Sequence, residues 1–264
     1  MSILKKITTL GAALASVALV SGCSSTEVDS AEADNALSRA QDAGVIRAGI
    51  EGAYPPFNAF DENNELVGFD VDITKALADR LDVEVEFVPT PWDTIIGGLN
   101  AGRYDLVISS LTITEERAEK VDFTDPYYHT GSQIFAPEGH EITDTDDLSS
   151  VVVGVTLGTT FEEMAVERGA TVSTYKSDQL AMEDLANGRL GAVITDNPVG
   201  NAIISENEYS IVEVGDRISN PAAGIAVDKG EQELLDAMNE ALAEIQSDGT
   251  YEEISLEWFG TDIR

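Results

Sequence analysis

The fold class follows most directly from the segment Leu106-Val107-Ile108-Ser109-Ser110-Leu111-Thr112-Ile113-Thr114-Glu115-Glu116-Arg117. Its first three residues are apolar and are followed by hydroxyl residues, which predicts a short buried strand. Ser109 to Thr114 then form the loop that leaves the strand. Thr114 followed by two glutamates predicts an N-cap with acids in the first helical turn. This order is typical of an open α/β sheet, in which ligands bind beyond the carboxyl ends of the strands.

Arg117 is expected to project from the first turn of that helix, beside the hydroxyl-rich loop. A planar guanidinium in this position can bind a carboxylate through two parallel hydrogen bonds. The alternative is a surface arginine that pairs with Glu115 or Glu116. This segment alone favours neither interpretation, so the rest of the chain is needed to separate them.

The N-terminus has the pattern of an export signal. Two lysines precede an uncharged apolar stretch at 7–20, which is too short to span a bilayer. Small residues directly precede Cys23, the sole cysteine, and this arrangement resembles a lipobox in which Cys23 carries the lipid. A buried or stray thiol is the alternative. We therefore expect a signal peptide at 1–22, and a lipidated N-terminus with a flexible tether at 23–40.

The charge of the chain excludes several partners. There are 15 Lys and Arg residues against 49 Asp and Glu residues, which gives a formal net charge of −34. Such a surface repels nucleic-acid phosphates and anionic lipid headgroups. Membrane contact is therefore expected only through a lipid at Cys23. The acidity also suggests adaptation to high external salt, where counterions screen the self-repulsion, although an ordinary acidic secreted protein is the alternative.

Strand and helix signals alternate along the chain, and the alternation occurs twice. In the first half, the apolar spacing over 69–81 predicts a helix, and a strand with exposed glutamates follows at 83–87. In the second half, a strand at 151–155 leads into Thr160-Phe161-Glu162-Glu163, which fits a capping box. A further strand at 171–175 and a helix at 178–187 repeat the pattern. The sequence therefore predicts two α/β units with parallel strands.

Several motifs together resemble those of a known family. They are Gly68-Phe69-Asp70-Val71-Asp72-Ile73, the Ser109 to Arg117 segment, Asp122-Phe123-Thr124-Asp125-Pro126-Tyr127, and Ser247-Asp248-Gly249-Thr250-Tyr251 before Trp258-Phe259-Gly260. Their order and spacing over 43–260 resemble the family 3 extracellular solute-binding proteins, the amino-acid receptors of ABC importers. The resemblance implies an α/β fold of two lobes, periplasmic-binding-protein-like, each a mostly parallel sheet flanked by helices. Two crossing hinge strands would join the lobes.

The resemblance also implies the domain limits and the function. Lobe 1 would comprise 41–130 plus 222–264, and lobe 2 would comprise 131–221 with hinge segments at its ends. The protein would close around an extracellular amino acid and deliver it to an ABC permease in the membrane. We expect a monomer with no cofactor or metal, lipid-anchored to the outer face of the cytoplasmic membrane, at the cell surface or in the periplasm.

The resemblance assigns the ligand carboxylate to one group of residues. Arg117 would bind the α-carboxylate, assisted by backbone N–H groups at Thr112 and Thr160. The physical argument agrees, because Thr160 lies with Thr159 at a predicted helix N-terminus, where a carboxylate is stabilised.

The ligand ammonium would have a separate partner. Asp196 follows the predicted strand at 192–194 and would accept the α-ammonium, while Ser110 and Thr112 supply oxygens. Ser109 is a weaker candidate, which could simply cap the end of its strand. The alternative for Asp196 is a plain N-cap of the following helix.

Specificity would depend on residues farther along the ligand. Tyr54 and Trp92 match positions where the family stacks aromatic rings on the ligand, although both could instead fill the core. Glu51 matches an acid that meets the distal cation in relatives binding lysine, arginine and ornithine, and it would disfavour acidic ligands. We expect a polar, preferably basic, amino acid. Relatives resembling cystine receptors share the Glu-Gly-x-Tyr-Pro-Pro-Phe motif, so Glu51 leaves the identity open. Asp70 and Asp72 are interpreted as helix-start acids.

Two other functions are alternatives. Some proteins of this fold resemble receptors but act as periplasmic dehydratases. The two histidines, His129 and His140, show no catalytic or metal-ligand spacing and are expected to face solvent, so we expect no catalytic residue. A sensory module is the second alternative, and we expect no output segment after Arg264.

Overall fold

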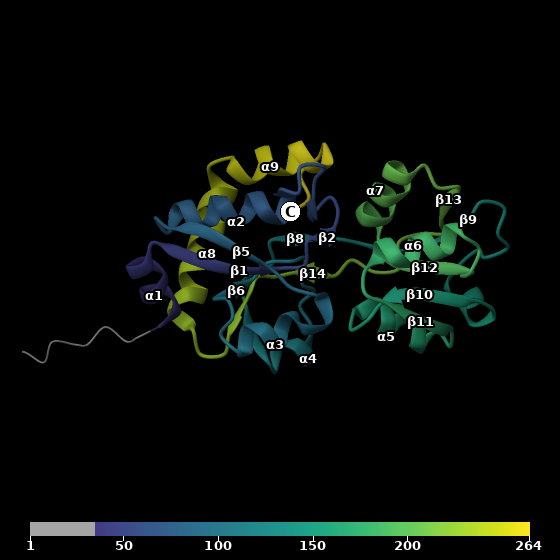
Figure 1. Cartoon of the computed structure of the whole chain (residues 1–264), viewed down its shortest axis with the longest axis horizontal. Coiled ribbons are helices and arrows are strands. Elements are labelled where there is room, and N and C mark those ends of the chain that lie inside the picture. The colour runs from purple at the N-terminus through teal and green to yellow at the C-terminus, as the bar shows by residue number, and fades with distance from the viewer. Residues whose placement is uncertain (1–34) are drawn as a thin grey trace, which may run out of the picture. The chain divides into compact units, whose positions relative to one another are not determined.

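The computed structural model describes residues 35–264, and these form two five-stranded sheets with helices packed around each (Figure 1). The predicted signal peptide and Cys23 lie outside the described residues. Within 35–264, no helix is both long and apolar enough to cross a membrane. We refer to 35–130 plus 222–264 as lobe 1 and to 131–221 as lobe 2. Lobe 1 was predicted to begin at 41, but 36–40 belong to the helix Ala36–Ala43, and the prediction of a flexible tether is wrong for these residues. The division into two lobes that move as separate bodies stays a prediction.

The sheet of lobe 1 has the order β5-β1-β6-β15-β7. Its strands are β1 (Val45–Ile50), β5 (Glu84–Pro89), β6 (Leu106–Val107), β7 (Val121–Phe123) and β15 (Ala226–Asp228). Strand β1 pairs in parallel with β5 and β6, whereas β15 runs antiparallel to both β6 and β7. The returning C-terminal segment therefore completes this sheet.

The sheet of lobe 2 has the same arrangement, in the order β11-β10-β12-β9-β13. Its strands are β9 (Ser132–Pro137), β10 (Val152–Thr156), β11 (Thr171–Tyr175), β12 (Ala192–Asp196) and β13 (Ile211–Val214). Strand β10 pairs in parallel with β11 and β12, and β9 runs antiparallel to β12 and β13. The predicted α/β fold is confirmed, and each sheet is mixed because strands that enter from the other lobe join it in the opposite direction.

Helices cover both sheets (Figure 1). In lobe 1 they are α1 (Ala36–Ala43), α2 (Phe69–Arg80), α3 (Ile95–Asn100), α4 (Glu115–Ala118), α8 (Gln232–Ser247), α9 (Thr250–Phe259) and the 3₁₀ turn η1 (Trp92–Thr94). In lobe 2 they are η2 (Thr145–Ser150), α5 (Thr160–Glu167), α6 (Asp178–Ala186) and α7 (Asn197–Asn207). The predicted helices at 69–81 and 178–187 are thus present as α2 and α6.

Short strands complete the connections. Strands β2 (Ala53–Tyr54), β3 (Asn58–Phe60) and β4 (Leu66–Val67) form a small antiparallel sheet. Strands β8 (Tyr128–His129) and β14 (Ala222–Ala223) pair antiparallel where the chain passes from lobe 1 to lobe 2 and back. The two crossings therefore lie side by side, between the large sheets (Figure 1).

A cluster of aromatic side chains supports the part of lobe 1 that faces lobe 2. Phe57 stacks on Tyr128 with ring centroids 4.8 Å apart, and Phe69 lies edge-on to Phe57 at 6.1 Å. Gly68, just before Phe69, has φ +136°, and a Cβ there would lie 2.2 Å from the Phe57 carbonyl oxygen. Only glycine permits this approach, which explains its place in the Gly-Phe-Asp motif. The packing fixes the start of α2 against the loop that carries Tyr54.

Candidate ligand-binding site

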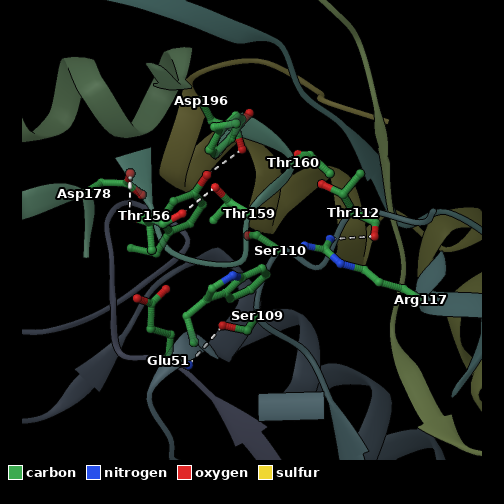
Figure 2. A pocket seen from close by; sticks show the side chains of 13 residues that line it. Glu51, Ser109, Ser110, Thr112, Arg117, Thr156, Thr159, Thr160, Asp178 and Asp196 are labelled. Carbon is green, nitrogen blue, oxygen red and sulfur yellow. Dashed lines mark hydrogen bonds between the residues drawn. The ribbon is translucent and has the colours of Figure 1, made fainter. Parts of the chain in front are cut away.

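A cavity lies between the lobes (Figure 2). Every residue predicted to contact the ligand lines it. These are Glu51, Tyr54, Trp92, Ser109, Ser110, Thr112, Arg117, Thr159, Thr160 and Asp196. Three further residues line the cavity and were not predicted from the sequence: Thr156, Phe161 and Asp178. Segments far apart in the chain therefore meet at one site.

Arg117 is held at one end of the cavity. Thr114 caps α4 as predicted, since its hydroxyl accepts a 3.2 Å hydrogen bond from the Arg117 N–H. The guanidinium is buried and donates to the carbonyl oxygens of Thr112 at 2.9 Å and Gly158 at 3.2 Å. Its carbon lies 5.3 Å from the centroid of the Trp92 ring. The alternative of a surface arginine is therefore wrong.

No carboxylate neutralises Arg117 among the described residues. Glu116 instead forms an ion pair with Lys120 at 2.7 Å on the surface. Burial lowers the pKa of Arg117, and the nearby charges of Glu163 and Glu116 partly oppose this effect. An arginine retains its proton despite such shifts. The cavity therefore presents a buried positive charge that lacks an anion.

Trp92 forms part of the wall beside this charge. The side chain is half-buried, and its Nε1 donates to the Gly158 carbonyl oxygen at 3.3 Å. The side chain also packs against the core cluster that contains Ile95 and Leu99. Trp92 therefore combines the two roles that the sequence left as alternatives, packing and cavity lining.

The loop after β6 is shaped by a buried carboxylate, Asp70. Asp70 lies in the first turn of α2, as predicted, but it is completely buried. It accepts hydrogen bonds from Ser110 Oγ at 3.0 Å, Tyr127 OH at 2.7 Å and Asn58 Nδ2 at 2.8 Å. Burial raises the pKa of Asp70 to about 6, against the lowering effect of these donors. The interpretation as a plain helix-start acid is incomplete, because Asp70 also holds the cavity loop.

The same loop is joined to the loop of Glu51. Ser109 Oγ accepts a 3.0 Å hydrogen bond from the Glu51 N–H, and Asn58 Oδ1 accepts one from Gly52 N at 2.8 Å. Ser110 has φ +55°, an uncommon conformation for a residue with a side chain. Its N–H donates to Tyr127 OH at 3.1 Å. These bonds set the positions of Ser109 and Ser110 before any ligand binds.

Asp196 lies on the opposite lobe, at the end of β12. It occupies the N-cap position of α7, yet its side chain makes no capping hydrogen bond. Its Oδ2 accepts a 2.7 Å hydrogen bond from Tyr54 OH, whereas Oδ1 is buried with no partner in the described part of the chain. Burial raises the pKa of Asp196 to about 6. An unpartnered carboxylate oxygen in a cavity is the group that an ammonium requires.

The N-terminus of α5 lies one residue away from its predicted position. Thr159, with φ −94° and ψ 161°, is the N-cap, and its hydroxyl accepts from the Glu162 N–H at 3.3 Å. Glu162 Oε2 in turn accepts from Gly158 N at 2.7 Å. The cap therefore lies at Thr159 rather than at Thr160, because the left-handed Gly158 is followed by Thr159 in the extended conformation that a cap needs. Glu162 binds the N–H of Gly158 and not that of the cap residue, so the predicted capping box is not formed. Thr160 becomes the first helical residue.

Asp178 is the functional candidate that the sequence prediction missed. It is the first residue of α6, 2% exposed, and its Oδ1 accepts from Thr156 Oγ1 at 2.9 Å. Burial raises its pKa to about 7. A signal for it exists, since Asp178 follows β11 closely and β11 pairs in parallel with the strand that precedes Thr159. Loops after neighbouring parallel strands meet at one edge.

Glu51 lies on the same side of the cavity as Asp178, away from Arg117 (Figure 2). No hydrogen bond or ion pair holds its carboxylate among residues 35–264. Burial raises the pKa of Glu51 to about 8, and the charge of Asp178 adds to the effect. The cavity therefore has a positive end at Arg117 and an acidic side at Glu51 and Asp178.

The histidines lie outside this site. His129 is exposed, as predicted, whereas His140 is half-buried, with a buried Nδ1 that has no partner among the described residues. Neither lines the cavity. In the described part of the chain, no group of three or more His, Cys, Asp or Glu residues has the geometry to hold a metal ion.

Comparison with known proteins identifies the family. A model of the bacterial extracellular solute-binding proteins, family 3, matches residues 46–261. The chain belongs to this family. The L-cystine-binding protein TcyJ of Escherichia coli (strain K12) is 37% identical over 251 residues, which cover 94% of this chain and 93% of that protein.

Solved structures of related proteins have the same two-lobed fold. An ancestral arginine-binding protein bound to glutamine is 43% identical, with a TM-score of 0.80 over 82% of this chain and 98% of its own. The ancestral amino acid-binding protein AncCDT-1, a precursor of cyclohexadienyl dehydratase, is 39% identical, with a TM-score of 0.79 over 84% of this chain and 99% of its own. These relatives are binding proteins, and they share the two lobes expected from the sequence motifs.

Proposed function

We propose that this protein captures an extracellular amino acid between its lobes and presents it to an ABC importer. The observation that carries the proposal is the pairing of two unsatisfied charges in one cavity. Arg117 in lobe 1 has no anion among the described residues, and Asp196 in lobe 2 has a free buried oxygen, Oδ1. The backbone of an amino acid supplies both a carboxylate and an ammonium. One ligand would therefore satisfy both groups.

The remaining polar groups fit the same assignment. The N–H groups of Thr112 and Thr160 would assist Arg117, because Thr160 begins α5 and helix N-termini favour anions. Ser110 and Thr112 would supply oxygens to the ammonium. Tyr54 and Trp92 would stack on the ligand side chain. The named relatives, which bind cystine or arginine, support a polar amino acid as the ligand.

Closure of the lobes would be driven by the ligand itself. A ligand shifts a conformational equilibrium only by as much as it binds one state better than the other. In the closed arrangement the ligand reaches Arg117 and Asp196 together, whereas in an open one it reaches only one of them. The receptor would then display a distinct closed form to the permease.

The family and the N-terminal pattern support export and a lipid anchor as part of the proposal. The family is extracellular by description. We propose that residues 1–22 are removed as a signal peptide and that Cys23 carries the lipid. Replacing Cys23 by serine should release the exported protein from the membrane fraction, as fractionation and immunoblotting would show. We further propose that the receptor is a monomer and not an enzyme, which incubation with ligands and product analysis would test.

A thermal-shift screen tests the proposed function directly. The panel comprises the proteinogenic amino acids with ornithine, citrulline, cystine and ectoine. A ligand that binds only the folded protein raises its melting temperature. At least one member should do so for the wild type, and the same ligand at the same concentration should raise the melting temperature of Arg117→Ala much less. Arg103→Ala, at an exposed position, is the matched control. A panel without any stabilising member would contradict the proposal.

A further inference from the structure

One carbonyl oxygen of lobe 2 accepts hydrogen bonds from two side chains of lobe 1. Gly158 lies in the turn that leads from β10 to α5. Trp92 Nε1 donates to its carbonyl oxygen at 3.3 Å, and Arg117 Nη2 donates to the same oxygen at 3.2 Å. A carbonyl oxygen has a lone pair for each of these bonds. We call the two bonds together the Gly158 clasp.

The donors and the acceptor of the clasp are each held within their own lobe. The guanidinium of Arg117 donates to the Thr112 carbonyl oxygen at 2.9 Å, and its carbon lies 5.3 Å from the centroid of the Trp92 ring. The Trp92 side chain in turn packs against a core cluster of lobe 1. On the other side, Gly158 N donates to Glu162 Oε2 at 2.7 Å. Groups that are already held lose little conformational entropy when they meet.

The clasp stands between the ligand cavity and a second cavity. Trp92 and Arg117 line both of these cavities. Gly158 and Glu163, from lobe 2, line only the second one, where they face Ile96 and other residues of lobe 1. Because the clasp joins the lobes at this wall, any parting of the lobes here separates the Gly158 carbonyl from both of its donors.

The ligand does not compete with the clasp. The guanidinium of Arg117 has more N–H donors than its bonds to Thr112 and Gly158 use, and the others can bind a carboxylate. The Tyr54 bond to Asp196 is different, because it occupies the carboxylate that the ligand ammonium would need. The clasp contains no ligand atom, so its strength does not depend on which amino acid is bound.

We propose that Trp92 is a positioning residue for closure: its indole N–H and Arg117 clasp the Gly158 carbonyl and stabilise the closed lobes independently of the ligand side chain. The inference rests on the proposed function, because closure around an amino acid is part of it. The face of the Trp92 ring remains available to the ligand, whereas its N–H serves the contact between the lobes. Trp92 thereby contributes to the binding of amino acids as a class.

Small-angle scattering on the full chain, without any amino acid, tests the clasp directly. Trp92→Phe keeps an aromatic ring and removes the N–H, so the lobes should open more often and the radius of gyration should rise. Trp258→Phe is the matched control, because Trp258 Nε1 donates 2.9 Å to Asp72 outside the cavity. Its radius of gyration should equal that of the wild type. A residue that only packs lobe 1 would change the melting temperature and leave the radius unchanged.

Calorimetry with L-glutamine, L-arginine and L-cystine adds a second readout. Each of these that binds the wild type should bind Trp92→Phe about 3- to 10-fold more weakly, because one hydrogen bond of the closed form is lost. The factor should be similar for all of them, since the lost bond does not involve the ligand side chain. Stopped-flow measurements should show most of the change as faster dissociation. Trp258→Phe should alter neither quantity.

The outcomes separate this inference from the proposed function. Equal radii of gyration in the wild type and Trp92→Phe would overturn the clasp and retain the receptor. Affinity losses that follow the ligand side chain would also overturn it, because Trp92 would then act on the ligand. Absence of binding by every amino acid would overturn the proposed function, while scattering without amino acids would still decide the clasp. If Trp92→Phe does not fold, Arg117→Ala decides by the same scattering measurement, because it removes the other donor to Gly158.

Discussion

The hydroxyl group of Tyr54 in lobe 1 donates a 2.7 Å hydrogen bond to Oδ2 of Asp196 in lobe 2. This bond crosses from one lobe to the other and occupies only one oxygen of the carboxylate. The second oxygen is buried without a partner among the described residues. Tyr54 thus orients Asp196 and leaves its other oxygen for a ligand.

Removing the guanidinium of Arg117 should weaken ligand binding strongly. Arg117→Ala leaves the ligand carboxylate without its charged donor, so affinity should fall by about 3 kcal/mol or more, which is about 100-fold or more. Calorimetry with the amino acid identified by the screen measures the change, with Arg103→Ala as the control. An unchanged dissociation constant would show that Arg117 is not the carboxylate partner.

Tyr54→Phe tests the bond between the lobes while it keeps the aromatic ring. Asp196 would lose the hydrogen bond that the Tyr54 hydroxyl donates. Affinity for the amino acid should fall by about 1.5 to 3 kcal/mol, typical of a hydrogen bond to a charged group. Tyr175→Phe is a matched control, because its hydroxyl donates 2.8 Å to Asp184 outside the cavity. Titration of both variants should separate them. Equal effects of the two changes would contradict a role for Tyr54 in the site.

Asp70→Asn should destabilise the fold and loosen the cavity loop. The amide NH2 would replace one of the two accepting oxygens and face either Tyr127 OH at Oδ1 or Ser110 Oγ and Asn58 Nδ2 at Oδ2, which already donate to Asp70. The expected loss in the free energy of unfolding is about 1 to 3 kcal/mol. Urea denaturation measures it, with the exposed Asp79→Asn on the same helix as the control. A stability equal to that of the control would mean that the buried network contributes nothing measurable.

The buried acids should make the unliganded protein less stable as the pH rises. The pKa is raised to about 8 for Glu51 and about 7 for Asp178, above the ordinary values of 4.5 and 3.8. Between those values the folded state holds more protons than the unfolded state, so the free energy of unfolding falls with rising pH. The contribution is fully present below about pH 4 and is lost by about pH 8.

Urea denaturation at pH 5 and pH 8 checks this dependence. The free energy of unfolding of the wild type should be lower at pH 8 than at pH 5. The double change Glu51→Gln and Asp178→Asn should make this difference smaller, because neither amide titrates. Carboxylates with lowered pKa values, such as Asp122 beside Lys229, act in the opposite sense but only near and below pH 4. They therefore do not obscure the comparison. If the wild type and the double variant showed the same pH dependence of stability, the buried acids would not be its cause.

Salt should stabilise the protein if its acidity is an adaptation to a saline medium. A net charge of −34 creates self-repulsion, which counterions screen. We propose this adaptation as the reason for the composition and expect a higher melting temperature in molar potassium or sodium chloride than at low ionic strength. Equal melting temperatures at both ionic strengths would refute the idea.

Local sequence pattern was sufficient to predict the fold class, the family and one helix cap of this protein. The alternation of strands and helices predicted the α/β fold, and the motifs around Asp70 and Arg117 predicted the family that comparison confirms. Thr114 was predicted correctly as a helix cap, since capping involves residues only three apart. The cap at Thr159 was missed by one position because the conformation of Gly158 was not visible in the pattern.

The burial of each side chain and the balance of its charge could not be predicted from local pattern. Both depend on which groups are removed from water when distant segments pack together. The only signal for Asp178 was its place after β11, and its burial, which raises its pKa to about 7, became visible only in the packed structure. The environment of Asp196 also depends on the other lobe, since Tyr54 donates to Oδ2 while Oδ1 is buried without a partner among the described residues. Periodicity and spacing can predict which side chains line the cavity. They cannot predict which of those side chains lack a hydrogen-bond or charge partner, because partners and desolvation are set by long-range packing.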